Sequence, residues 1–264
     1  INEPSRLTRL YIAKVHPVAD AGNIYFDDLT VISTASGYPD IDPAQVPSDT
    51  VPQDEANKAV KYQESDDSFR FVVFGDSHTP ETPLQNLLVK GLSDKINKES
   101  DVLALVGSGT HSIAVSFDKP AVITGTGYNS FDVKNSRFIQ LDMSKHSLRQ
   151  SSHTQWQWYL KQLDSFEGDN VFIFLSDSPG SFTDKLEAGL FKEILTEYRK
   201  ETDRNVWVFH KAGSNESYME RGVKYVTSAG LNTDGLLPDN ADTVLYILVT
   251  VKGQNVTFEF KPAI

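Results

Sequence analysis

Apolar and polar positions along this chain recur with two different periods, and together these periods predict an ordered series of strands and helices. The run Phe69–Phe74 is apolar and rich in β-branched and aromatic residues, which is typical of a buried strand. After Thr82-Pro83, apolar residues recur at helical spacing, and proline in the first turn favours a helix that begins there. Strand and helix patterns alternate in this way to the end of the chain, which indicates a layered α/β domain.

The later elements are predicted from the same two periods. Strands are expected at Val102–Val106, Ala121–Thr124, Arg137–Leu141, Val171–Leu175, Val206–Phe209 and Val223–Thr227, with a terminal hairpin at Thr243–Val251 and Val256–Phe260. Helices are expected near His153–Phe166 and around Leu186, Leu190, Ile194, Leu195 and Tyr198. Their apolar and aromatic residues fall on one face, so we expect that face in the core.

Residues 1–67 differ from the rest of the chain. Residues 1–34 contain two alternating segments, Arg9–Val15 and Asn23–Val31, which predict a β-ribbon. A two-stranded ribbon is marginal alone, so we expect it either to end an upstream β-sandwich or to pack on the main domain. Residues 35–67 are rich in proline and acidic residues, which is typical of a semi-rigid linker. The main domain is therefore expected at 68–264.

Composition narrows the classes of function. With 39% apolar residues the chain can bury a full core, while a net charge of −11 argues against binding nucleic acid or an anionic membrane. No apolar run reaches the about 20 residues that a membrane span needs. The chain has no cysteine, which excludes disulfides, thiol catalysis and zinc–thiolate sites and is typical of secreted bacterial proteins. We therefore expect an extracellular or cell-surface segment of a longer protein, with other domains of the same chain as neighbours.

Polar turns follow several of the predicted strands. The strand Phe69–Phe74 runs into Gly75-Asp76-Ser77-His78, and four later strands end in short turns of the same kind. Ligand sites in open α/β sheets form beyond the carboxyl ends of the strands, so these turns are expected to meet. The candidate site residues are Asp76, His78, Ser108, Thr126, Ser176, Asp177 and His210.

Over roughly residues 68–264, the order of these turns resembles the calcineurin-like metallophosphoesterase superfamily. The resemblance includes Asp76-x-His78, the strand Arg137–Asp142, the helix Thr154–Leu163 and the strand Gly222–Gly230. It implies a four-layer α/β sandwich with two mixed β-sheets flanked by helices. In that family, two divalent cations clamp a phosphoryl group and supply a metal-bound hydroxide.

The chain departs from the family's metal motifs after the first one. Where the family has G-D it has Gly107-Ser108, and where the family has G-N-H it has Gly125-Thr126-Gly127. Ser176 stands at the position of a lone histidine, and His210 is followed by Ala212 or Gly213 in place of the second histidine of G-H-x-H. Neutral hydroxyls are poor substitutes for carboxylate and imidazole ligands. We therefore expect no two-metal centre.

The motif residues that remain predict a site with fewer metal ligands than the family's. At most one divalent ion (manganese, zinc or iron) is expected, weakly bound by Asp76, His78 and His210. Ser108, Thr126, Ser176 and Asp177 are expected to contact a ligand, for which a carbohydrate or a phosphorylated cell-wall component is the expected class. The prediction is a degenerate metallophosphoesterase-like domain without hydrolytic activity, acting as a structural or ligand-binding module.

Two alternatives stay open. An active phosphomonoesterase or phosphodiesterase would use a single metal on Asp76, His78 and His210 or Asp177. The block Val73–Ser77 also resembles the opening of GDSL-type esterases, in which Ser77 would be the nucleophile. That chemistry needs a histidine base oriented by an acid, and the chain beyond His210 contains no histidine. The esterase is therefore the weaker alternative.

Overall fold

The structure is a computed structural model, and it describes residues 68–76, 82–107, 119–125, 127–230 and 244–263. The β-ribbon and linker expected in residues 1–67 lie outside this part of the chain. So do three candidate site residues, His78, Ser108 and Thr126, and Ser77, the nucleophile of the esterase alternative.

The first sheet has five strands in the order β11-β10-β1-β2-β3. Its strands are β1 (Ser68–Phe74), β2 (Val102–Leu105), β3 (Ala121–Ile123), β10 (Leu245–Lys252) and β11 (Asn255–Pro262). The neighbours β1, β2 and β3 are parallel, whereas β10 is antiparallel to both β1 and β11. Parallel pairing brings the carboxyl ends of β1, β2 and β3 to the same edge of this sheet.

The second sheet has six strands in the order β4-β5-β6-β7-β9-β8. Its strands are β4 (Asn129–Val133), β5 (Ser136–Gln140), β6 (Asn170–Leu175), β7 (Asn205–Lys211), β8 (Ser217–Glu220) and β9 (Val223–Ser228). The four central strands are parallel, and the two edge strands β4 and β8 are antiparallel to their neighbours. The sequence pattern predicts neither edge strand, because both are short and only partly apolar.

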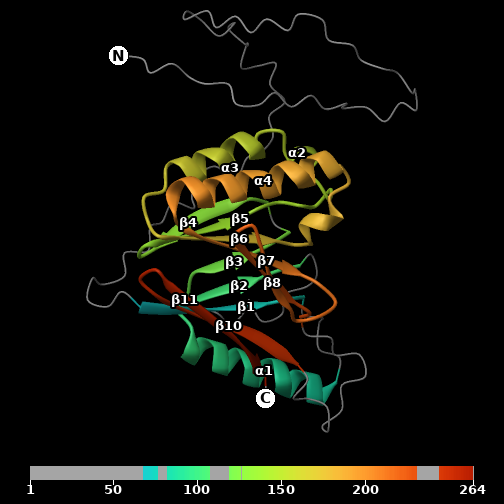
Figure 1. The fold of residues 1–264 in the computed structure, drawn as a ribbon. Helices are drawn as coiled ribbons and strands as arrows, with labels where there is room; N and C mark the ends of the chain where they lie inside the picture. Colours follow the sequence, from blue (N-terminus) through green and yellow to red (C-terminus); the bar gives the residue numbers. More distant parts are fainter. Residues whose placement is uncertain (1–67, 77–81, 108–118, 126, 231–243, 264) are drawn as a thin grey trace, which may run out of the picture. The chain divides into compact units, whose positions relative to one another are not determined.

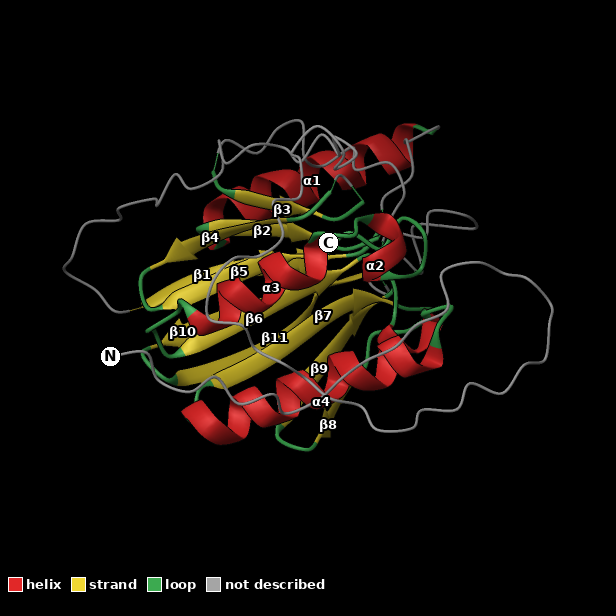
Figure 2. Ribbon diagram, turned by 90° about the horizontal axis from the view of Figure 1, so that it is seen from above, coloured by secondary structure: helices red, strands yellow, loops and turns green. Residues whose placement is uncertain are grey.

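Helices cover the outer faces of both sheets, which gives four layers (Figure 1). The helices are α1 (Pro83–Glu99), α2 (Leu148–Ser151), α3 (Gln155–Asp164), α4 (Lys185–Thr202) and the short 3₁₀-helix η3 (Pro179–Ser181). Figure 2 shows α3 and α4 lying across the second sheet, while α1 covers the first. Within the described residues, no helix has both the length and the apolarity that crossing a bilayer requires. The predicted four-layer α/β sandwich with two mixed sheets is confirmed.

Phenylalanine rings fill the space between the two sheets. Phe71 of β1 is fully buried, and its ring centroid lies 5.1 Å from that of Phe138, 4.8 Å from Phe172 and 5.7 Å from Phe209. These three residues belong to β5, β6 and β7, three neighbouring strands of the opposite sheet. A buried aromatic side chain removes a large apolar area from water, so this cluster holds the two sheets face to face.

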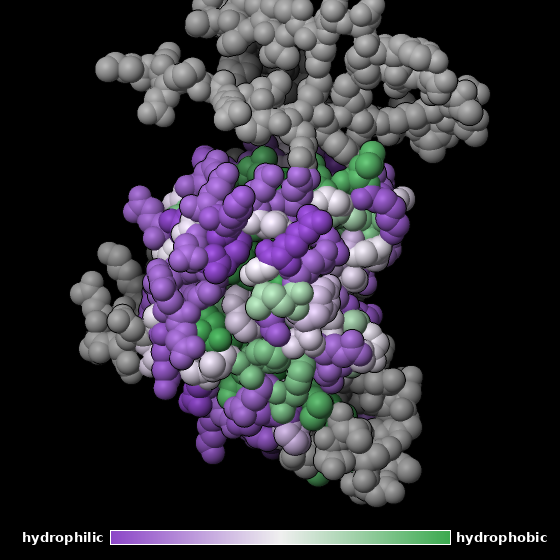
Figure 3. Space-filling view, viewed as in Figure 1, coloured by the Kyte–Doolittle hydropathy of each residue, from purple (hydrophilic) through white to green (hydrophobic). Residues whose placement is uncertain are grey.

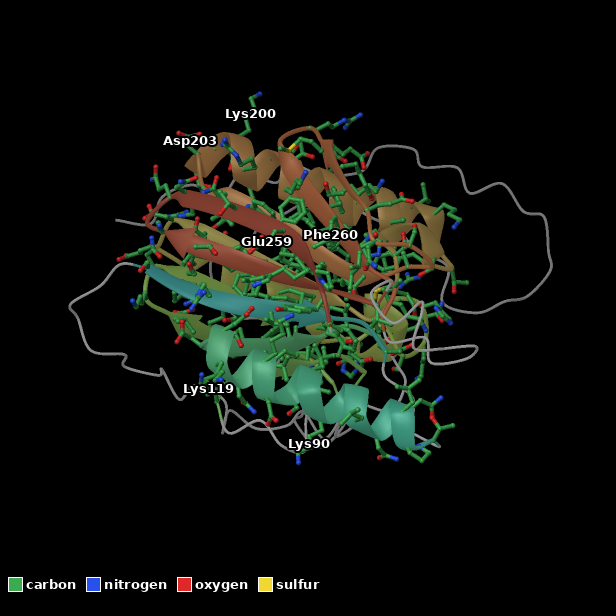
Figure 4. All side chains as sticks on the ribbon, turned by 90° about the horizontal axis from the view of Figure 1, so that it is seen from below. Lys90, Lys119, Lys200, Asp203, Glu259 and Phe260 are labelled. Atoms are coloured by element: carbon green, nitrogen blue, oxygen red, sulfur yellow. The ribbon has the colours of Figure 1, made fainter. Side chains whose placement is uncertain are left out.

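Both ends of α1 are closed by specific hydrogen bonds. Thr82 and Gln85 form a capping box at its start, each side chain accepting from the backbone N–H of the other residue. At the other end the ammonium group of Lys119 donates to the carbonyl oxygens of Asn97 and Ser100, at 2.7 and 2.6 Å (Figure 4). A cation at this position also suits the negative end of the helix dipole. These contacts fix α1 beneath the first sheet.

A buried carboxylate joins α4 to the loop before α2 and to α3. Glu187 is 1% exposed although it is charged, whereas its neighbour Leu186 is 68% exposed. The Glu187 carboxylate accepts hydrogen bonds from the Ser147 hydroxyl at 2.6 Å, the Arg149 backbone N–H at 2.9 Å and the Trp156 indole N–H at 2.7 Å. The expectation that Leu186 lies on the buried face of its helix is therefore wrong. Glu187 takes the buried position, because three hydrogen-bond donors beneath α4 need an acceptor.

Replacing Glu187→Ala is expected to lower the free energy of unfolding by about 3 kcal/mol, since it leaves three buried donors without an acceptor. Chemical denaturation followed by circular dichroism measures the change. Glu197→Ala, an exposed position on the same helix, is the control and should change stability by less than about 0.5 kcal/mol. Equal effects of the two substitutions would contradict the role of this carboxylate.

Candidate functional site

Asp76 lies just beyond β1, at the edge where the parallel strands of both sheets end. The residue is 8% exposed. Its carboxylate forms an ion pair with the ammonium group of Lys211, which is the last residue of β7 in the opposite sheet. The Asp76 side chain is 10% exposed and the Lys211 side chain 38%, so the pair reaches from the interior to the surface. This ion pair joins the two sheets at the predicted site.

The backbone around Asp76 is packed too tightly for side chains. A β-carbon placed on Gly75 would lie 2.5 Å from the backbone nitrogen of Gly230, which follows β9. A β-carbon on Gly107, which follows β2, would overlap the Oδ1 atom of Asp76. Gly107 also has a φ of 130°, a conformation that favours glycine. The Asp76 carboxylate is therefore enclosed by the main chain on the side where the family places its second metal motif.

Strand alternation places His210 and Lys211 on opposite faces of β7. Val208 packs in the core beneath the helices and Phe209 packs between the sheets, so the His210 side chain points toward the helices and Lys211 toward the first sheet. The charged groups that influence His210 agree with this placement, because they are Asp177 and Lys192 of α4. The structure thus brings Lys211, and not His210, to Asp76.

His210 is held as a neutral imidazole. It is 3% exposed, and burial lowers its pKa below the usual value, with the hydrogen bond to the Lys211 carbonyl opposing the effect only in part. Its Nδ1–H donates to that carbonyl oxygen at 2.9 Å. The Nε2 atom has no hydrogen-bond partner among the described residues. The ring therefore keeps a bare, buried lone pair on the helix side of the sheet.

The two other predicted ligand residues that the structure describes lie at the end of β6. Ser176 is buried, with 1% exposure. The Asp177 carboxylate lies 3.8 Å from Nδ1 of His146 and is close enough to His210 to influence its charge. Asp177 is thus placed near His210, whereas Asp76 contacts Lys211.

Two residues that no sequence motif indicated, Thr124 and Gln140, organise the loops next to Asp76. The Thr124 hydroxyl accepts from the backbone N–H of Gly107 at 2.8 Å and donates to the Gly107 carbonyl at 2.7 Å. Gln140 of β5 accepts from the Ile123 N–H at 3.1 Å and donates to the Gly127 carbonyl at 2.7 Å. Gln140 is 6% exposed, so it is a buried bridge from the second sheet to the loop after β3. A polar residue at the end of an apolar strand was the only sequence signal for it.

The described residues do not fit a metal centre of the family's kind. Metal binding at Asp76 would require its carboxylate to give up the Lys211 ammonium, and His210 faces away. Among the residues that the structure describes, no three His, Asp or Glu side chains are placed to bind one ion together. Around Asp76 the described residues instead place the Lys211 ammonium group and the tightly packed backbone at Gly75, Gly107 and Gly230.

The buried neutral His210 should make stability depend on pH. Its folded-state pKa is lowered, so below pH about 6.5 the unfolded chain binds a proton more readily than the native protein. The free energy of unfolding is therefore expected to fall as pH drops from about 6.5 through the folded-state pKa, and His210→Phe should reduce this slope. Urea unfolding at several pH values measures it. A His210 nuclear magnetic resonance titration centred above 6.5 would contradict the assignment.

No family model matches the chain, and no curated protein matches it. Among solved structures, GAP50, described as the anchor in the inner membrane complex of Plasmodium, is 12% identical, with a TM-score of 0.50 over 74% of this chain and 85% of GAP50. A Vps29 single mutant from Entamoeba histolytica is 12% identical, with a TM-score of 0.35 over 72% of this chain and 97% of Vps29. GAP50 has the fold that the sequence resemblance implied. Together with the two mixed sheets and their flanking helices, the likeness to GAP50 shows that this chain has the calcineurin-like metallophosphoesterase fold.

Proposed function

We propose that this domain is a metallophosphoesterase-fold module without metal-dependent hydrolysis, which serves as a structural or ligand-binding unit. The observation that carries the proposal is the ion pair between Asp76 and Lys211. Asp76 is the one described residue of the family's first metal motif, and its charge is balanced by a group of the chain itself.

An ammonium group and a divalent cation compete for the same carboxylate. A hard cation binds through several oxygen ligands, and each must be free to coordinate. At this site the Lys211 ammonium sits on the Asp76 carboxylate, so an incoming metal would meet a like charge as well as an occupied ligand. Phosphoryl transfer in this fold depends on metal charge and a metal-bound hydroxide. The side chain of Lys211 supplies neither the charge of a divalent metal nor a metal-bound hydroxide.

The proposed structural role has support from GAP50, since that protein is described as an anchor. For this chain, we propose neighbouring domains of the same protein and a carbohydrate or phosphorylated cell-wall component as partners. We also propose an extracellular or cell-surface location, which rests on the absence of cysteine from all 264 residues. Mass spectrometric identification of the mature chain in the culture medium or surface fraction tests the location.

Removing the internal cation should uncover a metal ligand. For Lys211→Ala we expect a lower melting temperature in metal-free buffer and an increase on adding manganese or zinc, because the Asp76 carboxylate loses its partner. The unsubstituted protein should bind these ions at least about tenfold more weakly, as measured by calorimetry. Lys200→Ala on the exposed face of α4 is the control. Metal binding that is equally tight with and without Lys211 would overturn the proposed substitution of metal by ammonium.

Hydrolysis should be at background. With manganese at neutral pH, we expect no turnover of nitrophenyl phosphate or bis-nitrophenyl phosphate, since losing several catalytic contributions of about 10²–10⁴-fold each leaves nothing measurable. The double substitution Asp76→Ala with His78→Ala distinguishes residual activity from a contaminant. If the protein hydrolyses these esters and the double substitution abolishes the activity, the one-metal phosphoesterase is the correct function.

A further inference from the structure

The outermost strand of the first sheet, β11, has an open edge along which backbone N–H and C=O groups point outward at every second residue. Within the described residues it pairs only with β10. The N–H of Ala263 donates to the carbonyl of Val244 at 2.8 Å, and antiparallel pairs alternate between bonded and non-bonded residues. Val256, Phe258 and Phe260 therefore direct their backbone N–H and C=O groups away from β10. No hydrogen bond joins these groups to another described element.

The side chains of the same three residues form an apolar surface beside this edge. Val256, Phe258 and Phe260 pack against the core between the sheets but remain partly exposed. The Phe258 ring lies 5.8 Å from Trp207 of β7, and the Lys224 ammonium of β9 lies 5.2 Å from the centre of that ring. Figure 4 labels Phe260 and Glu259 on this strand, and Figure 3 shows apolar residues gathered on the face over β8, β10 and β11.

The second sheet extends past the edge of the first. β11 lies over β7 and β9, while β8 is one strand further out. Met219 of β8 pairs with Lys224 in the strand register, so its side chain lies on the face that looks toward the first sheet. Met219 is 63% exposed. A strand added to β11 at the usual spacing of about 4.8 Å would therefore lie over Met219 and cover it.

We propose that β11 binds an extended peptide segment of a partner protein by strand addition. The partner segment would have apolar residues at alternate positions, facing Phe258, Phe260 and Met219. One acidic residue on the same face would meet Lys224, whose ammonium contacts the Ser217 hydroxyl at 3.0 Å and forms no ion pair with a described residue. This binding surface is separate from Asp76, so it does not depend on the loss of hydrolysis.

The overhang favours a single strand over a second copy of the chain. Antiparallel pairing of two β11 strands would require a two-fold axis perpendicular to the first sheet. Both second sheets would then lie on the same side, and each extends beyond β11 by the strand β8. The two overhanging sheets would occupy the same space. A single peptide strand carries no second sheet, so it can pair with β11 and lie over Met219 of β8 without this clash.

The test uses synthetic, end-blocked peptides in which valine alternates with threonine and one valine is replaced by glutamate. Binding to the full chain is measured by fluorescence anisotropy and by hydrogen exchange. We expect the peptide to protect the amides of Val256, Phe258 and Phe260 and to leave those of Thr257 and Glu259 unchanged. N-methylation of the peptide residues that face β11 should abolish binding, while N-methylation of the alternate residues should preserve it.

Substitutions in the protein locate the peptide. Met219→Glu should weaken binding of the glutamate peptide by about tenfold or more, because it places a carboxylate in the apolar groove. Leu186→Glu, at a similarly exposed position on α4, is the matched control and should leave binding unchanged. Lys224→Glu should favour a lysine peptide over the glutamate peptide, which reverses the preference of the unsubstituted protein.

Several results would overturn the proposal. One is equal binding to the Met219→Glu and Leu186→Glu variants. Another is the absence of added protection at the three edge amides. Protection of these amides in the free protein would show that another part of the chain covers the edge. If the amides became protected only at protein concentrations at which sedimentation shows a dimer, β11 would be an interface between two copies.

Discussion

The ring of Phe71 lies among Phe138, Phe172 and Phe209, and this packing between the two sheets sets the position of everything at their ends. Rings in contact across the interior fix the separation and the relative shift of the sheets. With that shift fixed, Asp76, two residues after β1, meets the last residue of β7, and the glycines after β1 and β9 come into backbone contact. The ion pair and the enclosed loops are therefore consequences of the hydrophobic interior.

A lysine and a metal ion solve the same electrostatic problem in different ways. A carboxylate that is 8% exposed needs a compensating charge, since leaving it unpaired in the interior is costly. A divalent ion compensates several acidic or imidazole ligands at once and activates water, whereas an ammonium group compensates one carboxylate and activates nothing. An ammonium group can thus hold this edge of the fold together without a metal. The burial of Asp76 needs no catalytic explanation.

Sequence patterns predicted the strands that pack in the interior and the two long helices of the second sheet's outer layer, because those segments have clear periods. The edge strands β4 and β8 and the short α2 have no such pattern. At the site, residue types and their order located Asp76 at a strand end. They did not reveal Lys211, since a lysine that follows a histidine has no special pattern and its partner is 135 positions away in the sequence, from 76 to 211. Gln140 and Glu187 were missed for the same reason: their partners lie on other elements.

The placement of His210 and Lys211 also bears on how such a domain changes during evolution. Successive residues of a strand face opposite sides, so a shift of one residue at the end of β7 would turn an imidazole toward Asp76 and an ammonium toward the helices. A single insertion or a β-bulge before His210 produces such a shift without any change of residue type. In this fold, one step along one strand therefore decides whether an imidazole or an ammonium group faces Asp76.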